Sequence, residues 1–456
     1  MVHTTIYIKT FGCSLNHSDS EVMSGLLKDA GYDVITDYID ETNKSISSQA
    51  NIGIVIINSC TVKNLAESKF FKELRKWKSR DVKILVAGCI TQAEPGLLQK
   101  ELSAVSVIGT RRISNVVDIV NKLVSGRIVH DISNDLNERL NLPKIRRTEI
   151  IEILPISEGC MSQCAFCKTK LARGELLSYP KEKIIAQFKS AVLEGCKEFW
   201  ITSQDNGCYG FDIYRKDKYF LPQLLNDLLS IDGDFRIRLG MSNPDHIDRI
   251  KDDLVETFKH PKMFKFLHVP VQSGNDAVLR NMKRSYTIKE FHNIITLFRK
   301  KIPGITISTD IIVGFPGESN AEFNDTLKFL KDVKFDVLNF SKFSMRKGTA
   351  AQKMKQLPGK LVKDRTEVLK KLFIELFAVQ NNVWLHRECS ILIDEYAKNG
   401  ELIGRNDYYK QIMIKDASGK IKIGDFVKVK IVQMKDYVLI GEEIIKDKKI
   451  KKYDDV

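Results

Sequence analysis

Three cysteines within eight residues are the side chains of this sequence best suited to chemistry. Cys160, Cys164 and Cys167 lie in the stretch EGCMSQCAFCKTKLARG, residues 158–174. Their thiolates can share one metal centre. The stretch supplies no fourth ligand, whereas closed structural zinc sites and electron-transfer iron-sulfur sites have four. The spacing therefore predicts a centre with one open coordination position. The alternatives are a zinc site completed by a distant ligand, or buried cysteines without a metal.

A second set of cysteines follows apolar runs in the N-terminal part of the chain, residues 1–150. TIYIKTFGC, IGIVIINSC and VKILVAGC end at Cys13, Cys60 and Cys89, and a helical pattern follows each run. Repeated strand, loop and helix predict a doubly wound parallel sheet, in which the carboxyl ends of the strands share one ligand-binding edge. One cysteine after a buried strand is most often a core residue. A cysteine at the end of three such strands predicts a second three-cysteine centre. We expect it to be an iron-sulfur cluster in which one iron has an open coordination position.

Residues 151–345 predict a six-unit β/α partial barrel. The strand candidates are EILPISEGC, EFWITSQD, RIRLGM, FKFLHVPVQS, ITISTDIIVGFP and VLNFSKFS, with amphipathic segments between them. Chemistry in such barrels lies at the carboxyl ends of the strands. Cys160, residues 203–205, Met241, Gln272 and Gly314 fall at that end. Without the cysteine loop, these positions would read as ordinary βα-loop residues.

Composition indicates a cytoplasmic protein of two to four domains. The chain has 456 residues, of which 43% are hydrophobic and 29% are charged. Its start lacks a signal-peptide layout, and no run approaches the roughly 18 apolar residues that span a membrane. Nine cysteines without a dense framework favour thiolate ligands in a reducing compartment over disulfides. Of the remaining cysteines, we expect Cys196 and Cys389 to be structural, and the role of Cys208 is open.

The net charge of +14 is concentrated in two stretches. Residues 259–301 contain 10 basic and 2 acidic residues, and residues 346–386 contain 9 and 3, which together account for the whole excess. A solvated charged face is the simplest explanation of one such run. Two separated runs favour a polyanionic partner, with RNA as the first choice.

The last part of the chain predicts a helix followed by a small β-barrel. GKLVKDRTEVLKKLFIELFAVQNNVWLHRE, which begins in the basic linker 346–386, has apolar residues at helical spacing. Five short β-rich segments, parted by Gly, Asn and Asp, follow in residues 387–446. They predict a five-stranded antiparallel barrel, a shape often used to hold RNA. Residues 387–446 contain 11 basic and 10 acidic residues, so they contribute little to the excess positive charge of the chain. We expect the tail, residues 447–456, to be flexible.

Over essentially its whole length the sequence resembles the radical S-adenosylmethionine (SAM) methylthiotransferases. TFGCSLN, NSC and AGC resemble the N-terminal cluster domain of that family, and EGC with the CxxxCxxC loop resembles its SAM cluster. PVQSGNDAVLRNMKRSYT and STDIIVGFPGE match later hallmarks, and the final domain resembles the RNA-binding TRAM module. CKTKLARG, TSQDNGCYGFD and RLGMSNP are most similar to the branch that modifies threonylcarbamoyladenosine next to the anticodon of tRNA. FSMRKGTAA lacks a proline common in relatives, and Ser14 replaces a common glutamine; neither affects a ligand.

The resemblance implies two [4Fe-4S] clusters and two SAM molecules per product. Cys13, Cys60 and Cys89 would bind an auxiliary cluster, and Cys160, Cys164 and Cys167 a radical cluster whose open iron chelates SAM. One SAM would methylate a sulfur species on the auxiliary cluster. The other would be reduced and cleaved to a 5′-deoxyadenosyl radical, which removes hydrogen from carbon 2 of the adenine. Such a C–H bond offers no acid-base route, so the protein orients the cofactors and excludes water.

The same resemblance suggests partners and further site residues. The partners are the anticodon stem-loop of tRNA, an electron donor and a sulfur source, with no membrane. Gln204 and Asp205 could hydrogen-bond the SAM amino group, and the turn at Gly314 could let backbone approach the adenine. The candidate cofactor-binding residues are thus Gln204, Asp205, Gln272, Gly314 and Phe166.

The carboxylate of a threonylcarbamoyl group needs a cation near a buried site, whereas an isopentenyl group would leave that cation unpaired. Lys168 and Lys170, directly after the radical cluster, are the substrate candidates, and both could instead point to solvent. Arg173 is a less informative third candidate. The alternative functions are methylthiolation of isopentenyladenosine in tRNA or of a ribosomal-protein aspartate. A non-catalytic iron-sulfur protein that binds RNA or transfers electrons is the alternative from another class.

Overall fold

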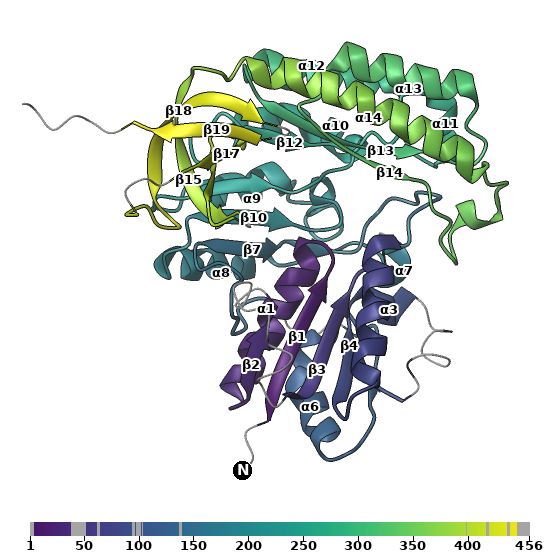
Figure 1. Ribbon diagram of the computed structural model, residues 1–456, viewed down its shortest axis with the longest axis vertical. Coiled ribbons are helices and arrows are strands. Elements are labelled where there is room, and N and C mark those ends of the chain that lie inside the picture. Colours follow the sequence, from purple (N-terminus) through teal and green to yellow (C-terminus); the bar gives the residue numbers. More distant parts are fainter. Residues whose placement is uncertain are drawn as a thin grey trace, which may run out of the picture.

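The chain forms two α/β domains and a small β-barrel (Figure 1). The structure is a computed structural model that describes residues 4–37, 52–61, 64–93, 96, 102, 104–135, 139–397, 399–415, 419–435 and 438–444. The predicted flexible tail, residues 447–456, lies outside these described residues. No helix among them is both long and apolar enough to cross a membrane.

The N-terminal domain is built on a six-stranded parallel sheet with the order β2-β1-β3-β4-β5-β6. The strands are β1 (Thr5–Phe11), β2 (Asp33–Thr36), β3 (Ile52–Ser59), β4 (Lys83–Ala87), β5 (Ser106–Ile108) and β6 (His130–Asp131). Helices α1 (Ser14–Asp29) and α6 (Val116–Val124) pack on one face, and α3 (Asn64–Lys78) packs on the other. The strand order reverses between β1 and β3, which makes the sheet doubly wound, as predicted.

The central domain is a partial barrel of six parallel strands. This confirms the six-unit β/α partial barrel that was predicted for residues 151–345. They are β7 (Ile151–Pro155), β10 (Glu198–Thr202), β11 (Arg236–Leu239), β12 (Phe266–His268), β13 (Thr306–Val313) and β14 (Val337–Lys342). The first three and the last three pair as separate sheets, and a parallel bridge between Ile237 and Met263 lies between them. The intervening helices are α8 (Lys181–Leu193), α9 (Leu221–Leu229), α10 (Pro244–Thr257), α11 (Asp276–Asn281), α12 (Ile288–Lys301) and α13 (Asn320–Val333).

The segment between the first two domains crosses α1 at close range. The backbone N–H of Ile145 donates to the Glu21 carbonyl at 3.0 Å. A Cβ atom at Gly25 would lie 2.3 Å from the Pro143 carbonyl, so only glycine lets the two backbones approach this closely. This crossing fixes α1, and with it the first cysteine of the N-terminal set, against the central domain.

The predicted long helix is α14, which spans Gly359–Asn382 and ends before the predicted limit at residue 388. Trp384 explains the difference, because its side chain is buried in the core of the β-barrel and the chain must turn to place it there. The barrel strands are β15 (Glu388–Tyr396), β16 (Leu402–Asn406), β17 (Gln411–Ile414), β18 (Phe426–Lys435) and β19 (Val438–Glu443). The barrel is closed as β15-β16-β17-β19-β18. The β17–β19 pairing is parallel, unlike the antiparallel pairing predicted throughout.

The β-barrel is attached at the amino ends of the central strands. The Tyr409 hydroxyl donates to Glu198, the first residue of β10, at 3.0 Å, and Lys410 pairs with Asp336, just before β14, at 2.8 Å. The cysteine loop follows the carboxyl end of β7, so the barrel and the loop lie at opposite ends of the central strands.

Candidate metal centres

The structure brings Cys13, Cys60 and Cys89 together at one edge of the N-terminal sheet. Cys13 follows β1, Cys60 follows β3, and Cys89 follows β4 and opens α4 (Cys89–Ala93). These three strands are neighbours in the sheet, so their carboxyl ends are adjacent. The Cys60 thiol lies near enough to both other thiols that each pair shifts the pKa of its members. Residues separated by 47 and 29 positions therefore form one group of sulfur atoms.

Glycines with positive φ precede three of the six cysteines. Gly88 has φ 90°, and a Cβ atom there would lie 2.2 Å from the Asn58 amide oxygen. Gly159, before Cys160, has φ 71°, and a Cβ atom there would lie 1.9 Å from the Glu175 carbonyl oxygen. Gly12 is similarly enclosed between Asn16 and Cys60. These positions need glycine for both backbone conformation and space.

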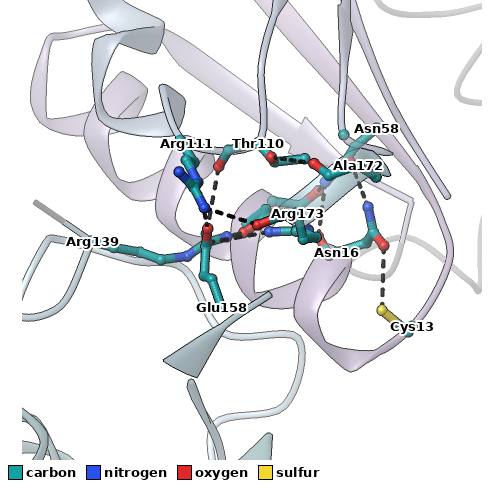
Figure 2. Close-up of polar contacts among 12 residues, drawn as sticks. Cys13, Asn16, Asn58, Thr110, Arg111, Arg139, Glu158, Ala172 and Arg173 are labelled. Atoms are coloured by element: carbon teal, nitrogen blue, oxygen red, sulfur yellow. Dashed lines mark hydrogen bonds and ion pairs between the residues drawn. The ribbon is translucent and has the colours of Figure 1, made fainter. Parts of the chain in front are cut away.

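Buried amides fix Cys13 over the end of β3 (Figure 2). The Cys13 thiol contacts the Asn16 amide oxygen at 3.4 Å, and Asn16 donates to the Asn58 side chain at 3.0 Å. Asn58 in turn donates to the Asn16 carbonyl and to the Ser20 hydroxyl. Asn16, Ser20 and Asn58 are fully buried, so this network fixes the position of α1 relative to the sheet.

The second cysteine group is held within one loop of the central domain. The backbone N–H of Ser162 donates to Cys160 Sγ at 3.3 Å, and Arg284 donates to Cys164 Sγ at 3.2 Å. The N–H of Cys167 donates to the Cys164 carbonyl at 3.1 Å. Donors directed at sulfur favour thiolates, which are the form that binds metal.

The two groups differ in the pKa of their thiols. The hydrogen bond from Cys60 lowers the pKa of Cys13 and of Cys89, and the positive charge of Arg173 lowers both further, while the pKa of Cys60 rises. In the loop, burial raises the pKa of Cys160 to about 12, with help from the charge of Asp205. Burial also raises the pKa of Cys167. The pKa directions thus favour the thiolate form of Cys13 and Cys89 in the N-terminal group, and disfavour that of Cys160 and Cys167 in the loop.

Gln204 and Asp205 lie beside the cysteine loop and are engaged by protein groups. The Gln204 amide oxygen accepts from the Gly159 N–H at 2.7 Å. The Asp205 carboxylate is 2% exposed, accepts from the Asn243 N–H at 3.0 Å, and contacts His246 Nδ1 at 2.6 Å. One of its oxygens lies 3.9 Å from Cys160 Sγ. Both residues therefore position the loop, a role the sequence did not suggest.

Cys208 belongs to the same buried group. Its thiol donates to the Asp205 carbonyl at 3.1 Å, and Asp205, Cys208 and His246 offer three possible ligand atoms within 4.8 Å of one another. Cys196 lies in the hydrophobic core of the central domain, and Cys389 packs against the core of the β-barrel, as predicted.

The other cofactor candidates occupy three different settings. Gln272 is half-buried with φ 72°, and its backbone bonds to Asp310 and Ile312 on β13. Phe166 stacks edge-on against Phe315, with 6.5 Å between ring centroids. The turn at Gly314 was expected to let backbone approach the adenine. A Cβ atom at Gly314 would lie 2.6 Å from the Val362 side chain, so α14 packs against one side of this glycine.

The three substrate candidates also differ in environment. Lys168 is 3% exposed, and Lys170 pairs with Glu175 at 2.9 Å while keeping about a quarter of its side chain exposed. Arg173 ends α7 (Thr169–Arg173) and is 1% exposed. Because its guanidinium is held by buried carboxylates of the protein, Arg173 is a structural residue and not a substrate ligand.

A buried cluster of two arginines and two carboxylates joins the N-terminal domain to the cysteine loop (Figure 2). Arg173 pairs with Asp19 of α1 at 2.7 Å and with Glu158 at 3.3 Å. Arg139, from the segment between the domains, pairs with the same two carboxylates. Arg111, which is partly exposed, also pairs with Glu158 at 4.0 Å, so each buried carboxylate has at least two arginine partners, as buried ions require. Sequence reasoning missed Asp19 and Arg139; the only signal was a run of polar residues inside the helix after Cys13.

The structure divides the basic residues of 259–301 into two classes. Lys262, Lys265, Arg284 and Arg299 donate to carbonyl or thiol groups of the protein. Lys259, Arg280, Lys283, Lys289, Lys300 and Lys301 are exposed. In residues 346–386, Arg346 pairs with Glu67 and Arg365 with Glu318, while seven lysines are exposed. The exposed residues are the ones best placed to contact an external polyanion.

Comparison with known families divides the chain in the same order as the fold. Residues 5–109 match Uncharacterized protein family UPF0004, residues 154–330 match the Radical SAM superfamily, and residues 386–444 match the TRAM domain. Among solved structures, the radical S-adenosylmethionine methyltransferase TsrM from Kitasatospora setae has a TM-score of 0.53 at 12% identity, covering 74% of this chain and 72% of that chain. This likeness concerns the fold alone.

Curated relatives match over nearly the whole sequence. The probable threonylcarbamoyladenosine tRNA methylthiotransferase of Pyrococcus horikoshii is 35% identical over 442 residues, covering 96% of this chain and 99% of that protein. The threonylcarbamoyladenosine tRNA methylthiotransferase of Homo sapiens is 35% identical over 447 residues, which cover 96% of this chain and 74% of that protein. The enzyme of the same name from Danio rerio is 37% identical, over 90% of this chain and 73% of that protein. With this identity and coverage, the chain belongs to the threonylcarbamoyladenosine tRNA methylthiotransferases, a family of radical SAM enzymes.

Proposed function

We propose that this chain adds a methylthio group to carbon 2 of N6-threonylcarbamoyladenosine next to the anticodon of tRNA. The observation that carries the proposal is the presence of two three-cysteine groups, one in each of two domains joined by a buried ion-pair cluster. Family membership supplies the substrate class. The domain division that we propose is 1–150, 151–345, 346–386 and 387–446.

The donor set of each group fits a [4Fe-4S] cluster. Thiolates are the ligands of such clusters, and three of them leave one iron open. Cys13, Cys60 and Cys89 would hold the auxiliary cluster, and Cys160, Cys164 and Cys167 the radical cluster. When bound, the clusters and two SAM molecules per product supply the electron, the radical, the sulfur and the methyl group.

The residues of the chain hold these groups in place. Arg284 and the N–H of Ser162 stabilise the loop thiolates, while Gln204 and Asp205 fix the loop. We propose that Gln204, Asp205, Gln272 and Phe166 form the SAM site, because they lie on the cysteine loop or at carboxyl ends of central strands. We also propose that the backbone of the turn at Gly314 approaches the adenine, on the side away from Val362 of α14.

Partners follow from the reaction and from the surface. We propose the anticodon stem-loop of tRNA as the substrate, bound by exposed lysines of 259–301 and 346–386 and by the TRAM domain. An electron donor and a sulfur source are also required, and a cytoplasmic location suits the reduced thiols. Lys170, or Lys168, would meet the substrate carboxylate.

The test is anaerobic reconstitution followed by nucleoside mass spectrometry. We expect the reduced protein to convert threonylcarbamoyladenosine in tRNA to its methylthio derivative and to release 5′-deoxyadenosine. Product only from tRNA carrying isopentenyladenosine, or only from the ribosomal protein, would assign a different substrate. Absence of 5′-deoxyadenosine from iron-loaded protein would favour the non-catalytic alternative.

A further inference from the structure

Helix α3 carries a group of basic side chains on its exposed side. Phe70, Leu74 and Trp77 are buried in the core of the N-terminal domain and fix the opposite side of the helix. Residues three or four positions apart on a helix are neighbours, with about 5 to 6 Å between their Cβ atoms. Neighbours of this kind form what we call the α3 basic patch, on the side of the sheet opposite α1 (Figure 1). Its exposed members are Lys69, Lys72, Arg75 and Lys76.

The fold gives most of these charges no counter-charge. In the part of the chain that the structure describes, no carboxylate forms an ion pair with Lys69, Lys72 or Arg75, and Lys76 pairs with Glu73 at 3.3 Å. Like charges three or four residues apart destabilise a helix. The helix dipole offsets this for Arg75 and Lys76, which lie in the last turn, but not for Lys69 and Lys72. An anionic partner would remove the repulsion.

The net charge of the chain conceals this patch. Residues 69–80 contain six basic residues and one acidic residue. The two stretches 259–301 and 346–386 equal the whole excess charge of +14, so acidic residues elsewhere must balance those of α3. The α3 basic patch is therefore a third cationic surface, and it lies on the N-terminal domain.

The patch lies close to the auxiliary cysteines and to the second basic stretch. α3 begins four residues after Cys60, at the edge of the sheet where the N-terminal cysteines meet. Glu67, in the first turn of α3, pairs with Arg346 at 2.7 Å, and the next residue, Lys347, is exposed. The α3 basic patch thus continues the basic stretch 346–386 across the joint between the domains.

We propose that the α3 basic patch binds tRNA phosphates and orients the anticodon stem-loop over the auxiliary centre. The inference rests on the proposed function, which supplies the tRNA. A row of fixed cations matches the regular negative charges of a nucleic-acid strand, and binding releases the counterions of the phosphates. Phosphate contacts of this kind set the register and orientation of a nucleic acid on a protein. The N-terminal domain would therefore position the target adenine in addition to holding a cluster.

The experiment removes the three charges that have no ion pair, in the full chain loaded with iron. Lys69, Lys72 and Arg75 are replaced together with glutamine, and binding of tRNA carrying threonylcarbamoyladenosine is titrated at several salt concentrations. We expect the logarithmic salt slope to fall by about 2 to 3, because each lost phosphate contact removes about 0.7 to 0.9. The variant with Lys69→Arg and Lys72→Arg keeps the charges and should keep the slope.

A matched control removes three charges from the other face of the same sheet. Lys28 of α1, Lys122 of α6 and Arg127, just after α6, are replaced together with glutamine. The change in net charge is the same, so a general loss of positive charge would act equally in both variants. We expect this control to bind tRNA with the salt slope of the unaltered protein.

An unchanged slope in the α3 variant, or an equal decrease in the control, would overturn the inference. SAM cleavage without tRNA is measured in parallel, with dithionite and with a reduced acidic ferredoxin as alternative electron donors. Unaltered tRNA binding together with slower cleavage by ferredoxin alone would assign the patch to an electron donor and also overturn it. Failure of the unaltered protein to form the methylthio product would count against the proposed function, whereas the salt slopes test the patch separately.

Discussion

The two cysteine groups reach similar chemistry by different structural routes. In the N-terminal domain, three strand ends separated by 47 and 29 residues must pair in one sheet before Cys13, Cys60 and Cys89 meet. In the central domain, Cys160, Cys164 and Cys167 share one loop, with Ser162 and Arg284 directed at its sulfur atoms. The first group depends on a whole fold, and the second depends mainly on local geometry. Damage to the N-terminal sheet should therefore affect the first centre directly, and the second only through the contacts of Asp19, Thr110 and Arg111 with the end of the loop.

The electrostatics of the groups differ in the same sense. The N-terminal thiols hydrogen-bond to one another and have Arg173 beside them, which lowers the pKa of Cys13 and Cys89. The loop thiols lie in a buried site beside Asp205, which raises the pKa of Cys160. The pKa directions therefore favour the thiolate form of Cys13 and Cys89, and disfavour that of Cys160 until a metal binds it.

Breaking the buried ion-pair cluster should have the largest effect on stability. Asp19→Asn leaves Arg139 and Arg173 with a single carboxylate, and we expect a loss of about 3 to 5 kcal/mol in the free energy of unfolding. Urea unfolding measures the change. The control is Asp118→Asn, which removes an exposed pair with Lys122 and should cost about 0 to 1 kcal/mol. An equal loss of unfolding free energy in Asp19→Asn and Asp118→Asn would show that the ion-pair cluster does not stabilise the contact between the two domains.

Glycine substitutions should separate the two groups with a somewhat smaller effect. Gly88→Ala and Gly159→Ala force a Cβ atom into backbone or amide oxygens, and overpacking adds about 1 to 3 kcal/mol to the cost of a positive φ. Gly126→Ala and Gly195→Ala are matched controls, since both have positive φ and open space. We expect Gly88→Ala to lose N-terminal iron and Gly159→Ala to lose radical-loop iron, as measured by iron analysis. Loss of all iron in each variant would contradict independent sites.

Removing a lysine that binds the substrate carboxylate should lower catalysis and leave both metal centres intact. If Lys170 or Lys168 meets the threonylcarbamoyl carboxylate, replacement by valine should cost about 1.5 to 3 kcal/mol in kcat/KM for the modified tRNA. Cleavage of SAM without tRNA should be unchanged. Lys122→Val, on the exposed surface of α6, is the control. Full turnover by the Lys168→Val and Lys170→Val double variant would exclude charge recognition by these lysines.

The smallest effect for each residue changed should come from the exposed lysines of 259–301. Replacing Lys283, Lys289, Lys300 and Lys301 with glutamine should weaken tRNA binding and reduce its salt dependence, by about 0.7 to 0.9 in the logarithmic slope for each phosphate that is no longer neutralised. Binding titrations at several salt concentrations measure the slope. Lys262→Gln and Lys265→Gln, which remove inward-facing charges, should leave the slope unchanged. An unchanged slope in the exposed-lysine variant would show that these lysines are solvated surface residues that do not contact tRNA phosphates.

Local pattern predicted the fold and the convergence of the cysteines, because alternating strands and helices place strand ends at a common edge. It could not predict that Asp19 pairs with Arg173, since this contact joins residues 154 positions apart on two domains. Nor could it show that Lys262 and Lys265 turn inward or that α14 packs against Gly314. These features depend on how the elements pack, which local sequence does not encode. The short strands β2, β5 and β6 also lacked the apolar length that identified β1, β3 and β4.

The central claim is that one chain holds two independent metal centres with different roles. Iron analysis of the reconstituted protein, combined with SAM cleavage by Cys160→Ala and Cys13→Ala, tests it most directly. We predict about eight irons per chain in the unaltered protein and about half in each variant. Cleavage should be lost in Cys160→Ala and retained in Cys13→Ala. About four irons in the unaltered protein, or loss of cleavage in both folded variants, would contradict the account.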